Sequence, residues 1–236
     1  MRRALLLQVG HTFEEIARVR GDYDRWFREG LGYADGELEV ARVFDGTPVP
    51  SSYDYDGVVV TGSWSMVTDR EPWSEASADY LREAVARELP VLGVCYGHQL
   101  LAHALGGLVG YNPTGRHAGT AIVELTDAAR NDALFSPFDG PMVVQVSHSQ
   151  AVLDLPAEAS LLARCERDPH HAFRIGKCAW GVQFHPEFDA DVARAYIQMR
   201  YATIAAEGID PEALLAAIQD SIHGPQLLAR FRSLIR

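Results

Sequence analysis

Three short apolar runs, within residues 4–9, 55–61 and 91–94, constrain the fold of this chain most strongly. Strands that are apolar without alternation are typical of parallel sheets covered on both faces. Segments with helical spacing lie between these runs, at 13–27 and in the stretch that ends at Leu89. Because parallel strands are joined by crossover helices, the pattern predicts an α/β fold with a doubly wound, mostly parallel sheet flanked by helices.

The remaining elements are predicted from the same periodicities and from turn residues. Ser74 is placed to cap the helix that continues to Leu89, and Pro90 stops that helix. In the second half, short strands separated by turn residues favour antiparallel pairing and a smaller antiparallel sheet. The other predicted elements are strands at 38–44, 121–125, 142–147, 160–165 and 179–184, and helices at 97–105, 189–207, 211–221 and 225–235.

Composition excludes several classes of protein. A formal net charge of -11 repels phosphate backbones and anionic lipid heads, so nucleic-acid binding is not predicted. No run approaches the ~20 apolar residues of a membrane span, and the cytoplasm is the expected location. The three cysteines show no Cys-x-x-Cys spacing, so neither a disulfide framework nor a metal site is predicted. Without linkers or repeats, residues 1–236 are expected to form one domain, with a core at 1–204 and a C-terminal helical extension at 205–236.

The motif Gly93-Val94-Cys95-Tyr96-Gly97 ends an apolar run and begins a predicted helix. It is the cysteine counterpart of the Gly-x-Ser-x-Gly elbow, in which a nucleophile on a sharp strand-to-helix turn points out above the sheet. Gly93 and Gly97 would leave room for neighbouring backbone, and the helix N-terminus would stabilise a thiolate on Cys95. Since most free cysteines are structural, the elbow alone leaves a structural and a catalytic role equally open.

The segment His185-Pro186-Glu187 follows the predicted strand at 179–184 and supplies a partner for a thiolate. His185 can exchange a proton near neutral pH. Pro186 favours extended backbone, which places residues two apart on the same side. Glu187 can therefore orient His185 as the acid does in a Ser-His-Asp triad. A histidine at a strand end is more often structural, but a His-x-Glu pair together with a cysteine elbow favours catalysis.

Together, the elbow at Cys95 and the segment at 185–187 resemble the class I, triad-type glutamine amidotransferases. The resemblance covers most of the chain, from Ala4 to about Ile204, and the order and spacing of the two motifs agree with that family. It implies a flavodoxin-like sheet, with Cys95 as nucleophile, His185 as base and acid, and Glu187 as its orienting partner. No metal or organic cofactor is expected.

Further site residues are implied by the resemblance alone. A loop after the third strand supplies an oxyanion N–H in this family, and Gly62 is the corresponding donor here, beside the N–H of Tyr96. Many members have Gly-Gly-Pro where this chain has Thr61-Gly62-Ser63, a form that resembles the stand-alone, guanylate-synthetase-like branch. The implied substrate-binding residues are Ser63, Gln99, Ser147 and His148.

The implied reaction is attack by Cys95 on the γ-carbonyl of glutamine, with a γ-glutamyl thioester on the way to glutamate and ammonia. The sequence contains no Walker-type loop and no Ser-Gly-Gly-Val-Asp-Ser loop, so a separate synthetase is the expected partner. A stand-alone hydrolase of γ-glutamyl peptides or amides is the alternative. A non-catalytic binding module on the same fold is a third hypothesis, which the presence of Cys95, His185 and Glu187 disfavours.

The last predicted helices carry an apolar face formed by Leu214, Leu215, Ile218 and Ile222. Packing into the core of the chain is the favoured interpretation of this face. Contact with a partner protein, or with a second copy in a homodimer, is the alternative.

Overall fold

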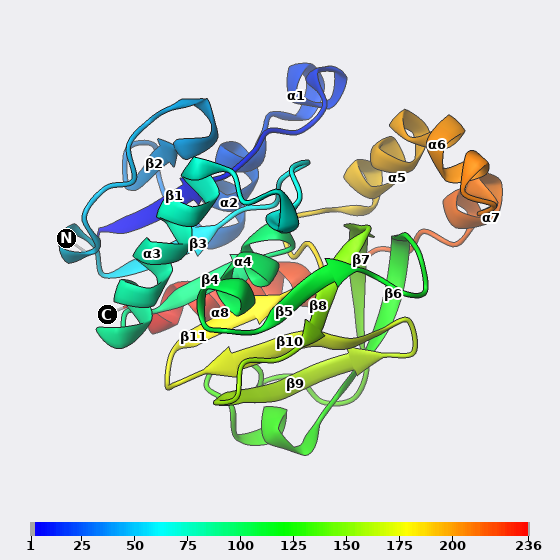
Figure 1. Ribbon diagram of the computed structural model, residues 1–236. Helices are drawn as coiled ribbons and strands as arrows, with labels where there is room; N and C mark the ends of the chain where they lie inside the picture. The colour runs from blue at the N-terminus through cyan, green and yellow to red at the C-terminus, as the bar shows by residue number, and fades with distance from the viewer. Residues whose placement is uncertain (1–2, 236) are drawn as a thin grey trace.

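The computed structural model describes residues 3–235 and contains a mixed sheet flanked by helices (Figure 1). The strands are β1 (Ala4–Gln8), β2 (Leu38–Arg42), β3 (Gly57–Val60), β4 (Val91–Val94), β5 (Leu108–Tyr111), β6 (His117–Leu125), β7 (Met142–His148), β8 (Gln150–Asp154), β9 (Ala159–Cys165), β10 (Asp168–Ile175) and β11 (Ala179–Val182). The α-helices are α1 (Glu14–Arg20), α2 (Tyr23–Leu31), α3 (Pro72–Ala86), α4 (Tyr96–Ala104), α5 (Ala190–Met199), α6 (Tyr201–Ala206), α7 (Pro211–Ala216) and α8 (His223–Leu234).

The large sheet has the strand order β2-β1-β3-β4-β11-β10-β9-β6-β7. Its first five strands pair in parallel. From β11 onward the pairing is antiparallel, so the predicted antiparallel strands extend the main sheet. The separate small antiparallel sheet consists of β5 and β8. Because β4 and β11 are parallel neighbours, the residues that follow each of them emerge at the same edge of the sheet.

The parallel strands β1, β3 and β4 are buried along their whole length, and helices cover both of their faces. Adjacent strand residues point to opposite sides, so Leu6 and Val59 pack with residues of α2 and α8. Leu7 and Val60 pack with residues of α3 and α4 on the other face. This three-layer arrangement confirms the predicted doubly wound, mostly parallel α/β fold.

Two predicted helices are each divided in the structure. The segment at 13–27 forms α1 and the first part of α2, separated at Gly21, whose φ of 83° ends α1. Asp22 then caps α2 by accepting a hydrogen bond from the Tyr23 N–H. The segment at 189–207 divides at Arg200 into α5 and α6. Periodicity alone missed both breaks because the apolar spacing continues across them.

The prediction that Ser74 caps a helix is wrong. The cap position of α3 is Glu71, and Ser74 lies inside the helix, where its hydroxyl is 2.7 Å from the Tyr96 hydroxyl. The strands β5, β8 and β10 were not predicted. Strand β10 has the sequence Asp-Pro-His-His-Ala-Phe-Arg-Ile, which lacks apolar alternation, and it forms because β9 and β11 pair with it on either side.

The C-terminal helices pack onto the rest of the chain. On α8, Leu227 and Leu228 are fully buried in the cluster that contains α2. Ile218 is also buried, and Leu214 and Leu215 pack against the cluster that it shares with α5 and α6, so core packing is confirmed for these three. Ile222 is 66% exposed and does not share that environment. The domain limits 1–236 and 1–204 remain predictions, and residues 1, 2 and 236 lie outside the described part.

Within residues 3–235, no helix combines the length and the apolar character needed to cross a membrane.

Candidate active site

Cys95 occupies a strained turn between β4 and α4. Its φ of 52° and ψ of -101° place it in a region that residues with side chains rarely adopt. A Cβ on Gly93 would lie 2.4 Å from the Gly97 carbonyl oxygen, and a Cβ on Gly97 would lie 2.5 Å from the Val60 carbonyl oxygen. Both glycines are therefore needed for backbone to approach the turn, as the elbow motif predicts.

His185 and Glu187 follow β11 and form a buried pair. The His185 Nδ1 lies 2.7 Å from the Glu187 Oε1, and both side chains are at most 2% exposed. The His185 backbone N–H donates to the Gln145 carbonyl, and the Phe188 ring stacks on the imidazole at 4.1 Å. These contacts fix the orientation of the ring and leave its Nε2 side for Cys95, which lies near enough to raise the pKa of His185.

The electrostatic environment of His185 favours its protonated form. Burial lowers its pKa, but the charges of Glu187 and Cys95 and their hydrogen bonds outweigh burial and raise the pKa to about 10. The ring can therefore hold a proton at neutral pH beside the sulfur. A protonated histidine next to a cysteine on a helix N-terminus is an arrangement that stabilises a thiolate.

A pocket opens beside Cys95. Five residues predicted from the sequence line it, namely Ser63, Tyr96, Gln99, Ser147 and His148. The Ser147 carbonyl oxygen is 4.0 Å from the Cys95 sulfur. Gly62 lies beside the His185 ring: a Cβ on Gly62 would be 3.0 Å from the His185 Cε1.

Gln99 and His148 have additional contacts that the sequence did not indicate. The Gln99 amide nitrogen donates to the Gln150 carbonyl and to the Gln183 side chain, so it joins α4 to β8 and to the strand end of β11. The His148 ring Nε2 lies 3.4 Å from a carboxylate oxygen of the buried Asp168. Each residue therefore has structural partners in addition to its place at the pocket wall.

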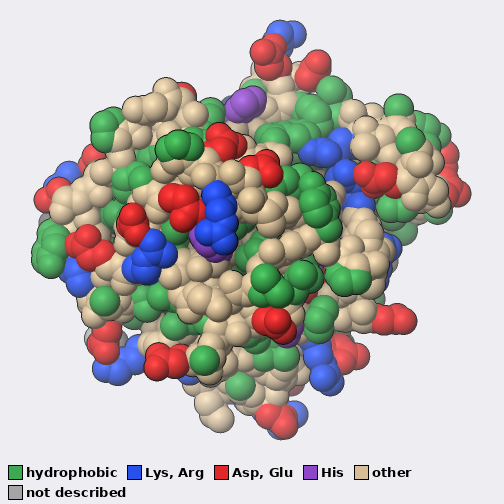
Figure 2. Space-filling view, viewed as in Figure 1, with side chains coloured by type: hydrophobic (Ala, Val, Ile, Leu, Met, Phe, Trp, Pro, Cys, Tyr) green, Lys and Arg blue, Asp and Glu red, His purple; other side chains and the backbone are tan. Residues whose placement is uncertain are grey.

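Two arginines at the pocket were missed by sequence reasoning. Arg116 pairs with both carboxylate oxygens of Glu207, at 2.7 and 2.8 Å. Arg200 lies at the break between α5 and α6, with its guanidinium 4.0 Å from the centre of the Trp64 ring. Its Nε is buried without a hydrogen-bond partner among residues 3–235. Figure 2 shows a group of Lys and Arg side chains beside α5 and the ends of β6 and β7, and further basic and acidic side chains scattered over the rest of this face.

Comparison with known proteins agrees with this fold. The model of the glutamine amidotransferase class-I family matches residues 25–202. The chain is 29% identical over 181 residues to γ-glutamyl peptidase 5 of Arabidopsis thaliana, covering 75% of this chain and 72% of that protein. It is 37% identical over 131 residues to a glutamine-hydrolyzing GMP synthase of Aeropyrum pernix, covering 56% of this chain and 24% of that synthase.

Among solved structures, a glutamine amidotransferase from Thermotoga maritima has the same fold, with a TM-score of 0.78 and 23% identity. That similarity covers 100% of this chain and 98% of the other. The family model matches three quarters of the chain, and the similar proteins include a γ-glutamyl peptidase. The chain therefore belongs to the class-I glutamine amidotransferase family.

Proposed function

We propose that this protein hydrolyses the γ-amide of glutamine through a Cys95-His185-Glu187 triad. The observation that carries the proposal is the strained turn that places Cys95 beside His185, whose Nδ1 lies 2.7 Å from the Glu187 Oε1. Triad catalysis needs a nucleophile beside a base, and an acid that orients the base.

The reaction follows from the charges at the site. The Cys95 thiolate attacks the γ-carbonyl carbon, and the carbonyl oxygen takes the negative charge. Protonated His185 gives its proton to the leaving nitrogen, the C–N bond breaks, and a γ-glutamyl thioester remains. Water then loses a proton to His185 and attacks the thioester, the C–S bond breaks, and glutamate leaves. No cofactor is needed for these steps.

Two backbone N–H groups are proposed to bind the oxyanion. Tyr96 is the first residue of α4, where N–H groups have no partner within the helix. Gly62 adjoins His185 and so faces the same reacting carbon. Preorganised donors of this kind each contribute roughly 3–4 kcal/mol of transition-state stabilisation.

The pocket wall is suited to an amino-acid substrate. The guanidinium groups of Arg116 and Arg200, close to Ser147 and His148, can pair with the α-carboxylate that glutamine carries. We infer that Ser63 and Gln99, which line the same pocket, contact the bound γ-glutamyl group. The ammonia is proposed to pass to a separate synthetase, as the similarity to a GMP synthase suggests.

Hydrolysis of γ-glutamyl peptides is the second candidate function. It uses the same triad, because only the group attached to the γ-carbonyl differs. The similarity to a γ-glutamyl peptidase extends over 72% of that protein, whereas the similarity to the GMP synthase extends over 24% of it. A similarity that extends over most of a γ-glutamyl peptidase is the observation that favours this candidate.

A substrate panel tests the function. We expect purified protein to release ammonia from glutamine or alanine from γ-glutamyl-alanine, and to leave α-glutamyl-alanine intact because its scissile bond lies elsewhere. Whichever of glutamine and γ-glutamyl-alanine has the higher kcat/KM identifies the substrate class. Equal release from the α-linked isomer would contradict γ-glutamyl specificity, and no turnover with tight binding would support the non-catalytic hypothesis.

The pH dependence of the rate tests the role of Glu187. With the pKa of His185 near 10, kcat/KM should hold until about pH 9 and fall as the ring loses its proton. Glu187→Gln removes a charge that raises this pKa, so the alkaline limb should move to lower pH and the rate should fall roughly 10²–10⁴-fold. Glu158→Gln, at an exposed position, is the matched control. An unchanged profile in Glu187→Gln would refute the orienting role.

A further inference from the structure

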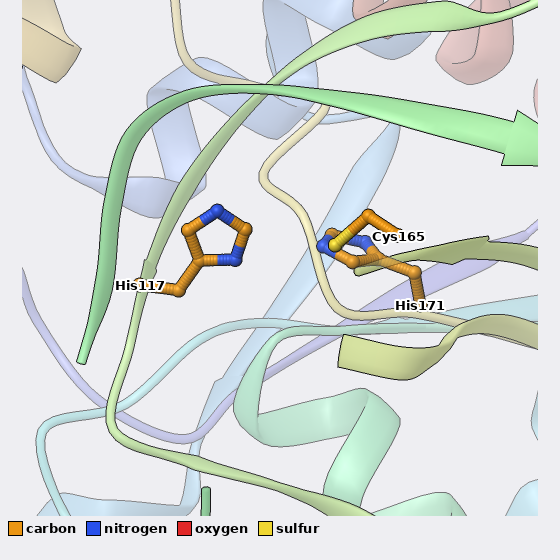
Figure 3. A group of neighbouring side chains, drawn as sticks. All are labelled: His117, Cys165 and His171. Atoms are coloured by element: carbon orange, nitrogen blue, oxygen red, sulfur yellow. The ribbon is translucent and has the colours of Figure 1, made fainter. Parts of the chain in front are cut away.

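A second cluster of reactive side chains lies apart from the triad. His117 comes from β6, Cys165 from the end of β9, and His171 from β10 (Figure 3). One ligand atom of each, two imidazole nitrogens and the sulfur, lie within 4.8 Å of one another. The proposed reaction uses none of these three residues.

The cluster contains buried polar atoms without partners. His117 is 8% exposed and His171 is fully buried. Three buried nitrogens have no hydrogen-bond partner within residues 3–235: both ring nitrogens of His171 and the Nδ1 of His117. Burying such a group without a partner costs about 1–3 kcal/mol, so native structures rarely leave several together. A bound ion would accept the lone pair of one nitrogen on each ring.

The surroundings also contain a buried carboxylate. Asp168 is fully buried; its Oδ1 accepts a hydrogen bond from the His170 backbone N–H, and its Oδ2 has no hydrogen-bond partner among the described residues, although the His148 Nε2 lies 3.4 Å away. The His148 ring is beside both cluster histidines, with centroids 5.4 Å from His117 and 6.0 Å from His171. A buried carboxylate is stable when a cation compensates it.

We propose that His117, Cys165 and His171 bind a Zn²⁺ ion, with the buried Asp168 carboxylate balancing its charge. Cysteine sulfur and histidine nitrogen are the ligand atoms that Zn²⁺ prefers in proteins. Bonds of about 2.0–2.3 Å require ligand atoms roughly 3.3–3.7 Å apart, so the three side chains must close by about 1 Å. Together, the Cys165 thiolate and Asp168 would neutralise a divalent ion.

The position of the site indicates a structural role near the active site. The ion would join β6, β9 and β10 across the antiparallel half of the sheet. His117 is the register partner of His148, and the adjacent Ser147 has its carbonyl at the Cys95 sulfur. The ion would therefore fix the strand end that forms one wall of the pocket, without taking part in the chemistry.

Metal binding by the full-length protein tests this proposal directly. Chelator-treated protein is titrated with Co²⁺ and with Zn²⁺ alone, following thiolate-to-cobalt absorption and Tm. We expect one equivalent to bind, and Tm to rise by roughly 5–10 °C at Zn²⁺ concentrations near one hundred times Kd. Cys165→Ser should lose the absorption band, and His117→Gln should weaken Zn²⁺ binding at least tenfold.

Matched variants separate this site from other thiols and histidines. Cys178→Ser and His103→Gln, which alter residues outside the cluster, should bind like the wild type. Cys95→Ser should also keep the cobalt band, which excludes the active-site thiolate as the ligand and does not depend on whether the proposed hydrolysis is correct. Wild-type protein without a Tm shift, or Cys165→Ser with a wild-type cobalt band, would overturn the proposal.

Discussion

Cys95→Ser is expected to lower kcat for the preferred γ-glutamyl substrate on the order of 10⁴-fold or more. A serine hydroxyl is far less acidic than a thiol, so protonated His185 beside it would face a neutral, weak nucleophile. The ion pair that primes the reaction would be absent, while the pocket would remain. Substrate binding should therefore survive, and the loss should appear in kcat more than in the dissociation constant of the substrate.

The control for this experiment is Cys178→Ser, which changes a cysteine that lies outside the pocket and bonds to the Glu88 carbonyl. Its kcat should match that of the wild type. Mass spectrometry after a brief incubation with substrate should detect a γ-glutamyl adduct on the wild-type protein and none on Cys95→Ser. Full activity in Cys95→Ser would show that the nucleophile is a different residue.

The second large effect is expected from Gly93→Ala, on stability and activity together. The added Cβ would meet three backbone atoms, including the Gly97 carbonyl oxygen at 2.4 Å and the His98 nitrogen at 3.0 Å. Backbone cannot move aside as a side chain does, so the start of α4 must shift away from β4. Overpacking of this kind costs about 1–3 kcal/mol or more, which is a fall in Tm of roughly 2–10 °C for a chain of this size.

Activity should fall with the displaced elbow, by about 10²-fold for a 1 Å shift of Cys95. Gly110→Ala is the matched control, because its Cβ would meet only side-chain atoms of Leu153, with Cδ1 at 2.8 Å, and no backbone. That variant should keep nearly the wild-type Tm and kcat. A Gly93→Ala protein with both quantities unchanged would show that the turn tolerates a side chain and is not closely packed.

Those features of the site that reside in contiguous residues could be predicted well. The elbow at Cys95 depends on an apolar strand, two glycines and a helix start, all within one short segment. The His185–Glu187 contact depends on a spacing of two in the segment after a strand. Each is a local pattern. The structure shows the sharp turn at Cys95 and the contact between His185 and Glu187.

Features that depend on residues far apart in the chain were missed or only partly predicted. Gln99 was implied to contact substrate, but its amide nitrogen also holds Gln150 and Gln183. Arg200 carries no motif and reaches the pocket only because α5 ends there. Strand β10 was unrecognised because tertiary pairing, not an apolar pattern, forms it.

By itself, the sequence determined the fold class and the pairing of a cysteine elbow with a His-x-Glu segment, since apolar period, glycine placement and short spacings are properties of neighbouring residues. The tertiary structure decided that β4 and β11 lie side by side, which brings Cys95 and His185 to one sheet edge. It also decided that His117, Cys165 and His171 converge from three strands, although no sequence spacing among them suggested a metal site. Contacts between distant segments depend on strand order and on the closure of loops between them, and composition and periodicity do not specify either.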